Sequence, residues 1–308
     1  MKRFVFGIIL AAILSLPSVV AWGGSMTLLG AGKPSAAAGY QGPGDVSGTS
    51  AYLFCGTIAY TNATIGQNAI RVTRRGDNAS QDFATQSNGK VDSAAVSTFI
   101  NGGGDTRGTI VTCYDQTGNG RDLTNTQIQA IEVVTSGQGG TVAFGSPNSF
   151  GNGFNQATGI TVSQPFTVTF AGKRTANFTS ENYAYGDITG TNVWGGWANI
   201  ADTARMSAGT NRDASDVQDN GTTSDYHAFA HVFNNAGTSR LYVGTTSNAI
   251  SAPGSNTIVS TFGLMAMIGQ GGMTGELSYL AIWAADLHAS GTADDVNSNV
   301  CTTLGFSC

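Results

Sequence analysis

Charged residues are scarce in this sequence: Asp, Glu, Lys and Arg make up 11% of its 308 residues. Few Lys and Glu leave little material for long surface helices. The formal net charge is −5 at pH 7, and it becomes −7 if Lys2 and Arg3 are removed with an N-terminal leader. Nucleic acids and anionic membranes are bound through clustered Lys and Arg, so neither is expected as a partner.

Long hydrophobic runs are absent after the N-terminus. Lys2 and Arg3 precede an apolar run over residues 4–16, which Pro17 ends, and small or medium residues follow at 19–21. This is the pattern of a secretory signal peptide over residues 1–21, and the run is too short for a comfortable membrane span. An uncleaved anchor is the alternative. We expect a secreted, periplasmic or cell-surface protein with no stable membrane insertion after cleavage.

Cysteine is limited to Cys55, Cys113, Cys301 and Cys308. An even number in an exported chain favours two disulfides, for which three connectivities are possible. Cys301 and Cys308 close a short loop at the end of the sequence, so we pair them with each other and pair Cys55 with Cys113.

Glycine is abundant, with 43 residues, and short apolar runs alternate with clusters of Gly, Asn and Ser. This alternation is typical of β-sandwiches and barrels. The runs that we predict as strands are residues 69–74, 109–114, 132–135, 141–144, 166–172, 226–234, 239–245, 260–268 and 273–283. Residues 234–237 are turn formers and predict a hairpin between two of these strands.

Three helices are predicted. Residues 46–60 have apolar side chains at helical spacing, and Asp92 is a suitable N-cap for a helix over 93–100. A third helix begins at Thr292, in a capping-box-like sequence with Asp295, and ends before Gly305. Residues 22–44 are rich in Gly, Ala, Ser and Pro, and we expect a lead-in segment there.

Two parts of the sequence resemble known families. Residues 44–124 resemble the start of the catalytic domain of α-L-arabinofuranosidase B-type proteins. The matching pieces, in order, are AYLFCGTIAY (51–60), AIRVTRRGDNASQDF (69–83), VDSAAVSTFI (91–100) and VTCYDQTGNGRDLT (111–124). The Tyr-Asp-Gln-x-Gly-x-Gly core is the most specific of them. Cys113 replaces a large residue of the family pattern, so the local packing is expected to differ.

Residues 109–305 resemble LamG-like, concanavalin A-like jelly rolls. The matching pieces are the turn 115–120, the strand pair AHVFNNAGTSRLYVGTT (230–246) and the closing strand MTGELSYLAIWAADL (273–287). The two resemblances together imply a mainly β fold: a concanavalin A-like jelly-roll β-sandwich with a small N-terminal α/β extension and a short C-terminal helix. We expect one domain over 45–308, in which 45–108 is the extension and 109–308 is the sandwich.

An arabinofuranosidase needs two carboxyl groups facing one sugar, about 5–5.5 Å apart in a retaining enzyme. The sequence has three glutamates, Glu132, Glu181 and Glu276. Glu276 lies in the predicted closing strand and Glu132 in an early strand, whereas Glu181 lies in a predicted loop. Glu181 is therefore the candidate nucleophile, although loop carboxylates are usually just solvated. No partner for it can be named from the sequence.

Aromatic side chains bind sugars because their flat faces pack against the C–H faces of the ring. Trp194 and Trp197 flank two glycines, which let a ligand approach the backbone closely. Tyr183, Tyr185 and Asp187 precede them. These five residues are the candidate ligand-binding set. Alternation along a strand sends Trp194 and Trp197 to opposite faces, so we expect one of the two in the core.

No metal cofactor is expected, with one open alternative. Asp115 precedes a Gly-rich turn that could coordinate Ca²⁺, but an Asp there more often caps the turn by accepting backbone hydrogen bonds. His227 and His231 are four residues apart on a predicted strand, which separates them too far for one metal.

The leading interpretation is a secreted carbohydrate-binding concanavalin A-like module. The first alternative is a glycoside hydrolase of α-L-arabinofuranosidase type, with the same fold and a working carboxylate pair. The second is an adhesive or structural surface module without catalysis. Fold analogy supports all three and does not choose among them.

Overall fold

The computed structural model describes most of the chain from residue 39 onward. The described residues are 39–125, 131–146, 154–155, 160–174, 182–187, 193–197, 203–209, 217–218, 225–234, 239–250, 253–258, 262–265 and 273–308. They belong to one compact unit, Lys33–Cys308. None of the helices in this part of the chain has the length and hydropathy of a membrane span.

The central layer is an antiparallel sheet whose long strands are buried on both faces. Its middle strands, β9 and β18, pair over eight positions, and β18 also pairs with β7 and β1 along its other edge. In order across the sheet, the strands are β16 (Thr246–Ile250), β15 (Ser239–Val243), β14 (His227–Phe233), β9 (Phe166–Arg174) and β18 (Gly275–Trp283). The far edge of β18 pairs first with β7 (Ala143–Ser146) and then, further along, with β1 (Leu53–Gly56).

A second layer faces this sheet. Its strands, in order, are β8 (Phe154–Asn155), β17 (Phe262–Leu264), β10 (Asn182–Asp187), β11 (Trp194–Trp197), β12 (Thr203–Ser207) and β13 (Val217–Gln218). Phe166, Val168 and Phe170 of β9 alternate toward the core shared with Tyr185 and Phe262. Two sheets packed through alternating side chains form a β-sandwich, which confirms the predicted fold class.

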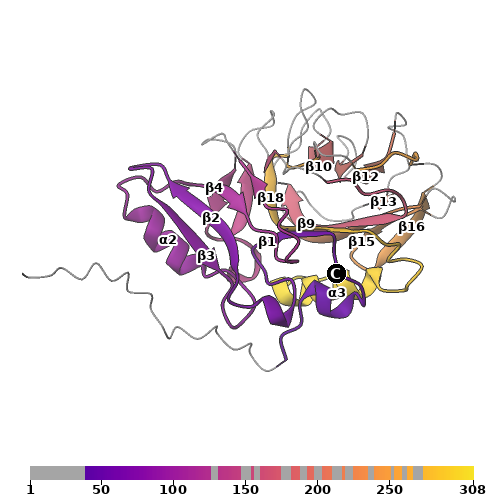
Figure 1. Ribbon diagram of the computed structural model, residues 1–308, viewed down its shortest axis with the longest axis horizontal. Coiled ribbons are helices and arrows are strands. Elements are labelled where there is room, and N and C mark those ends of the chain that lie inside the picture. The colour runs from indigo at the N-terminus through magenta and orange to yellow at the C-terminus, as the bar shows by residue number, and fades with distance from the viewer. Residues whose placement is uncertain are drawn as a thin grey trace, which may run out of the picture. The chain divides into compact units, whose positions relative to one another are not determined.

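The helix α3 (Ala293–Leu304) covers the outer face of the central layer (Figure 1). Ala228 and Ala230 of β14 and Ala171 of β9 point to this side, and their small side chains let Val296 and Val300 approach the sheet closely. Burial on both faces explains why the central strands read as continuous apolar runs. As predicted, α3 ends at Gly305, which has a positive φ of 72°.

The N-terminal part adds a smaller sheet with one helix. Its strands are β3 (Ser80–Ala84), β2 (Asn68–Arg74), β4 (Gly108–Cys113), and the short β5 (Leu123–Thr124) and β6 (Glu132–Val134). The helix α2 (Ser93–Asn101) begins where the Asp92 side chain accepts from two backbone N–H groups, as predicted. The remaining elements are α1 (Pro43–Val46), η1 (Asn62–Thr64) and η2 (Gln138–Gly140).

One helix prediction was wrong, and another was wrong in part. Residues 46–60 do not form a helix: β1 occupies Leu53–Gly56, and all four of its residues are buried. A strand buried on both faces has no alternation, so its apolar residues matched helical spacing by coincidence. The capping box at α3 is also absent, because the Thr292 side chain makes no cap hydrogen bond to the helix.

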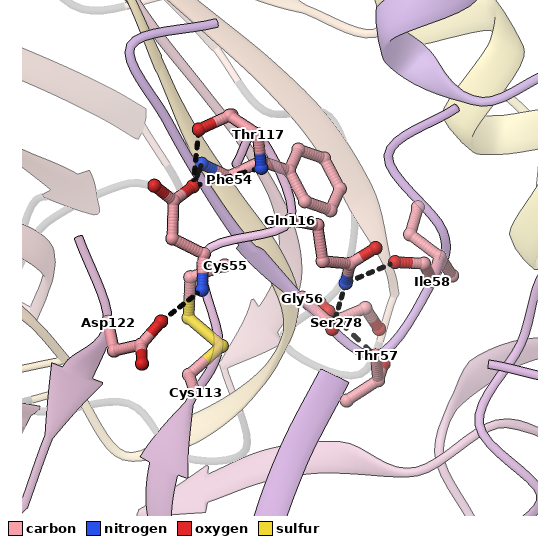
Figure 2. The surroundings of a disulfide bond; sticks show 11 residues. Phe54, Cys55, Gly56, Thr57, Ile58, Cys113, Gln116, Thr117, Asp122 and Ser278 are labelled. Atoms are coloured by element: carbon pink, nitrogen blue, oxygen red, sulfur yellow. Dashed lines mark hydrogen bonds between the residues drawn. A yellow bond between two sulfur atoms is a disulfide. The ribbon is translucent and has the colours of Figure 1, made fainter. Parts of the chain in front are cut away.

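The turn after β4 joins the N-terminal part to the sandwich (Figure 2). The buried Gln116 amide donates from Nε2 to the carbonyl oxygens of Gly56 and Ile58, each at 3.0 Å, and its Oε1 accepts from the Tyr60 N–H at 3.0 Å. The neighbouring Asp115 accepts from the Phe54 N–H at 3.1 Å. Asp115 and Gln116 thus provide hydrogen-bond partners for backbone groups of β1 and the residues after it that have none within the sheet.

Both predicted disulfides are confirmed. Cys55–Cys113 links β1 to β4 beside this turn, and Cys301–Cys308 closes the C-terminal loop. In the part of the chain that the structure describes there is no free cysteine. Disulfides persist in oxidising compartments, so this pairing indicates an extracellular type of environment.

We predict that Gln116→Leu lowers the free energy of unfolding by about 3 kcal/mol or more, because it leaves two carbonyls and one N–H buried without partners. Urea denaturation followed by circular dichroism measures this. The exposed Gln86→Leu is the matched control and should change stability by less than about 0.5 kcal/mol. Equal effects of the two substitutions would contradict this role of Gln116.

Candidate functional site

The candidate ligand-binding residues lie on β10 and β11, which pair with each other in the second layer. Gly186 is opposite Trp194, and Asn182 is opposite Trp197. The register shifts between Tyr183 and Tyr185. Such a bulge breaks the two-residue alternation, so the two tyrosines, which regular alternation would put on one face, join different clusters.

Tyr183 and Trp194 form a small cluster of their own. Their ring centroids are 5.1 Å apart and the ring planes are nearly perpendicular, at 89°. This edge-to-face contact is a favourable aromatic arrangement. The exposed fractions of Tyr183 and Trp194 are 1% and 3%. Their ring faces are therefore closed to a sugar in this structure, and ligand contact through them stays a prediction.

Tyr185 points instead into the core between the two layers. Its hydroxyl lies 2.8 Å from Nδ1 of His231 on β14, and both residues are fully buried. Phe170 contacts both rings edge-on, and Phe262 stacks on Tyr185. Burial lowers the pKa of His231 to about 3, so the imidazole is neutral at neutral pH. The pair is a polar link between the sheets inside an apolar core.

Gly195 makes room for this pair. A Cβ at Gly195 would lie 2.5 Å from the Tyr185 hydroxyl oxygen and would also clash with His231 Nδ1. The glycine that suggested ligand access from the sequence therefore serves packing: it admits a histidine–tyrosine pair where any other residue would collide with it.

The other candidates are located by their backbone only. Asp187 ends β10 opposite Phe262, and Trp197 ends β11 opposite Ala204. Glu181, the candidate nucleophile, directly precedes β10 and lies outside the described residues. Its role stays a prediction.

The other two glutamates have structural partners. Glu132 pairs with Arg75 at 2.8 Å, and Glu276 pairs with Lys173 at 3.3 Å. Further ion pairs in the N-terminal part are Arg71–Asp82, Arg74–Asp77 and Arg107–Asp105. The hydrogen bonds from Arg74 lower the pKa of Asp77 to about 2. An aspartate held in the charged form in this way is a poor general acid.

Asp115 has the geometry of a turn cap. Oδ1 accepts from the Phe54 and Thr117 N–H groups and from the Thr117 hydroxyl, and Oδ2 accepts from the Arg121 N–H. Among the described residues, no three His, Cys, Asp or Glu side chains come together as a metal site would need. Binding of Ca²⁺ at Asp115 stays a prediction.

Sequence reasoning did not identify two buried contacts, the hydrogen bonds of Gln116 and the partner of His231. Gln116 belongs to the quoted motif, but its spacing to Gly56, Ile58 and Tyr60 carries no local signal. The partner of His231 is on another sheet, 46 residues away in the chain. The only signal was a histidine in an apolar strand, which requires some buried hydrogen-bond partner.

We predict that acid weakens the protein through His231. The unfolded state takes up a proton near pH 6.5, but the folded state does so only near pH 3, so stability falls as pH decreases between these values. The slope is at most about 1.4 kcal/mol per pH unit.

Denaturation at pH 6.5 and 5 measures this slope, since carboxyl groups contribute little in this range. His231→Asn should flatten the slope, and His288→Asn is the control for loss of an imidazole. An unchanged slope in His231→Asn would refute this prediction.

We also predict that Gly195→Ala destabilises the protein by about 1–3 kcal/mol, because the added methyl group overpacks the Tyr185–His231 pair. Thermal unfolding measures the loss. Adding Tyr185→Phe removes one of the colliding atoms, so the double variant should lose less than the sum of the two single losses. Strict additivity would show that the collision is not with Tyr185.

No protein-family model matches the sequence, and no curated protein matches it. The fold is similar to those of solved arabinofuranosidases, of which three are described here. They are a GH54 α-L-arabinofuranosidase soaked with a cyclic sulfate inhibitor (17% identity, TM-score 0.60), a mutant of a GH54 α-L-arabinofuranosidase soaked with 4-nitrophenyl α-L-arabinofuranoside (16%, 0.59), and an arabinofuranosidase complexed with arabinofuranosyl-α-1,2-xylobiose (17%, 0.59). Each match covers 86% of this chain and 64–65% of the other. The chain thus spans just under two thirds of their length and has a similar fold.

Proposed function

We propose that this protein is an exported glycoside hydrolase that acts on α-L-arabinofuranosyl groups. The carrying observation is the similarity in fold to solved arabinofuranosidases over 86% of the chain. A match of this length extends beyond the sandwich into the N-terminal part, where the quoted sequence pieces resemble the same family. A sandwich alone would fit many binding proteins, so this extension favours the hydrolase.

Glu181 is the proposed nucleophile. Glu132 and Glu276 are committed to ion pairs, and Glu181 is the third glutamate of the sequence. The acid/base partner has to come from another segment. A strand rises about 3.3 Å per residue, so the two ends of β10, Asn182 and Asp187, lie about 16 Å apart. Asp187 is therefore too distant to complete a retaining pair with a residue next to Asn182.

Sugar contact in this proposal falls mainly to Trp197, which ends β11 opposite Asn182 and so lies at the Glu181 end of the strand pair. Asp187, at the other end of β10, would contact a different part of the substrate. Tyr183, Tyr185 and Trp194 are buried: Tyr183 packs on Trp194, and Tyr185 packs into the core between the layers. The predicted signal peptide and the two disulfides support export to an oxidising compartment.

A carbohydrate-binding module without catalysis is the second candidate. The observation in its favour is that the carboxylates of the N-terminal part with described contacts serve in ion pairs, caps and turns. A LamG-like binding module would need the same sandwich and no carboxylate pair.

Hydrolysis of 4-nitrophenyl α-L-arabinofuranoside tests the proposal. We expect release of 4-nitrophenol by the wild-type protein, and a loss of kcat of at least about 10³-fold in Glu181→Gln, because loss of a nucleophile removes covalent catalysis. Glu132→Gln is the matched control and should keep activity.

Three other outcomes are informative. Turnover that survives Glu181→Gln keeps the hydrolase and excludes Glu181 as nucleophile. Equal losses in both variants would indicate a general effect on folding. No turnover by the wild-type protein at high concentration would contradict the hydrolase and leave the binding module.

A further inference from the structure

The outer face of the N-terminal sheet continues into the second layer of the sandwich. The two join where Thr124 of β5 lies opposite Asn155 of β8. Residues directly opposite each other on antiparallel strands share a face of the sheet, so one row of residues can be followed from strand to strand. From β3 to β5 this row consists of Asp82, Arg71, Thr112 and Thr124.

The same row leads to the strands of the candidate site. Asn155 lies opposite Gly263 of β17, which lies opposite Gly186 of β10. Gly186 in turn lies opposite Trp194 of β11. Neighbouring strands are about 4.8 Å apart, so Thr124 and Gly186 are about 14 Å apart along the row. A polymer lying across the strands would therefore reach from the N-terminal sheet to β10.

The part of the row on the N-terminal sheet is accessible. The helix α2 covers the other face of this sheet, where Ile100 and Val72 belong to the buried core (Figure 1). On the face of the row, Arg71 and Thr124 are exposed and Thr112 is partly exposed. A ligand can thus contact this face without any rearrangement of the core.

A hydrogen-bonded network holds an aromatic ring beside the row. The Tyr114 hydroxyl donates to Oδ1 of Asp82 at 2.7 Å. Arg71 donates to the same carboxylate through Nε at 2.7 Å and Nη2 at 2.9 Å. Tyr114 is partly exposed, two residues after Thr112 and on the same face. Side chains fixed before binding lower its entropic cost.

The chemistry of this face favours a neutral ligand rich in hydroxyl groups. Arg71 and Asp82 form an ion pair, so their charges cancel and attract neither anions nor cations. The Nη1 group of Arg71 takes no part in that pair and can donate to a ligand oxygen, and threonine hydroxyls can donate and accept. The Tyr114 ring offers an apolar surface to the C–H face of a sugar.

We propose that this face, formed by Arg71, Asp82, Thr112, Tyr114 and Thr124, binds the main chain of a neutral polysaccharide that continues along the row toward β10 and β11. Binding here does not require hydrolysis. Its use, to bring the branches of the polymer to the hydrolase strands, rests on the proposed function.

Affinity electrophoresis in gels that contain soluble arabinoxylan tests the proposal. Removal of arabinofuranosyl branches leaves the main chain intact, so the wild-type protein can be used, and we expect it to be retarded. Tyr114→Ala and Arg71→Ala should each weaken the binding about tenfold, as loss of a main contact does. Thr124→Val, which replaces one hydroxyl by a methyl group, should weaken it about twofold or more.

Arg107→Ala is the matched control. Arg107 is also an exposed arginine of the N-terminal part in an ion pair, with Asp105, but it is outside the row, so this variant should bind like the wild-type protein. An equal loss in Arg107→Ala overturns the proposal, because the effect would then be one of net charge.

An unretarded wild-type protein also overturns the proposal. So does retardation that Tyr114→Ala and Arg71→Ala leave unchanged, since the face would then be an ordinary solvated face of an antiparallel sheet. Thermal unfolding identifies any variant that does not fold. If Tyr114→Ala is unfolded, Arg71→Ala and Thr124→Val decide.

Two substrates separate this proposal from the proposed function. Hydrolysis of 4-nitrophenyl α-L-arabinofuranoside by Arg71→Ala should stay within about twofold of wild type, because the small substrate does not extend to the N-terminal sheet, whereas KM for arabinoxylan should rise about tenfold. If the wild-type protein hydrolyses neither substrate, the proposed function fails, and the retardation result still decides whether this face binds the polymer.

Discussion

The side-chain amide of Gln116 is the interaction on which the arrangement of this protein depends. It satisfies three backbone groups between Gly56 and Tyr60 from a fully buried position. β1 pairs with β18, a middle strand of the central layer. The Cys55–Cys113 disulfide links β1 to β4 of the N-terminal sheet. A buried network with every member paired is worth more than its separate bonds. This network makes the N-terminal sheet part of the sandwich.

A second buried polar contact sets the distance between the layers. Tyr185 and His231 meet across the core, and Gly195 leaves the space for them. Hydrophobic packing alone tolerates small shifts between sheets, whereas a buried hydrogen bond has a preferred length and direction. This contact ties β10, one of the strands that carry candidate sugar-binding residues, to β14 of the central layer.

The sequence predicted those features whose signal is local. Asp92 as an N-cap and the Gly305 helix end depend on neighbouring residues, and the short C-terminal loop made the disulfide pairing plain. Features that depend on tertiary contacts were missed. The β1 strand looked helical because both of its faces are buried, and a bulge at Tyr183 separated two tyrosines that alternation would have kept together. The candidate nucleophile, Glu181, came from elimination among three glutamates.

Hydrogen–deuterium exchange of the wild-type protein tests most directly whether the Gln116 turn makes one cooperative unit of the two parts. The amides of Phe54, Thr57 and Tyr60 should be protected as strongly as those of β9 and β18, because they can open only when the whole sandwich unfolds. Fast exchange of these three amides while β9 and β18 stay protected would show that the N-terminal part opens independently, and would contradict the account.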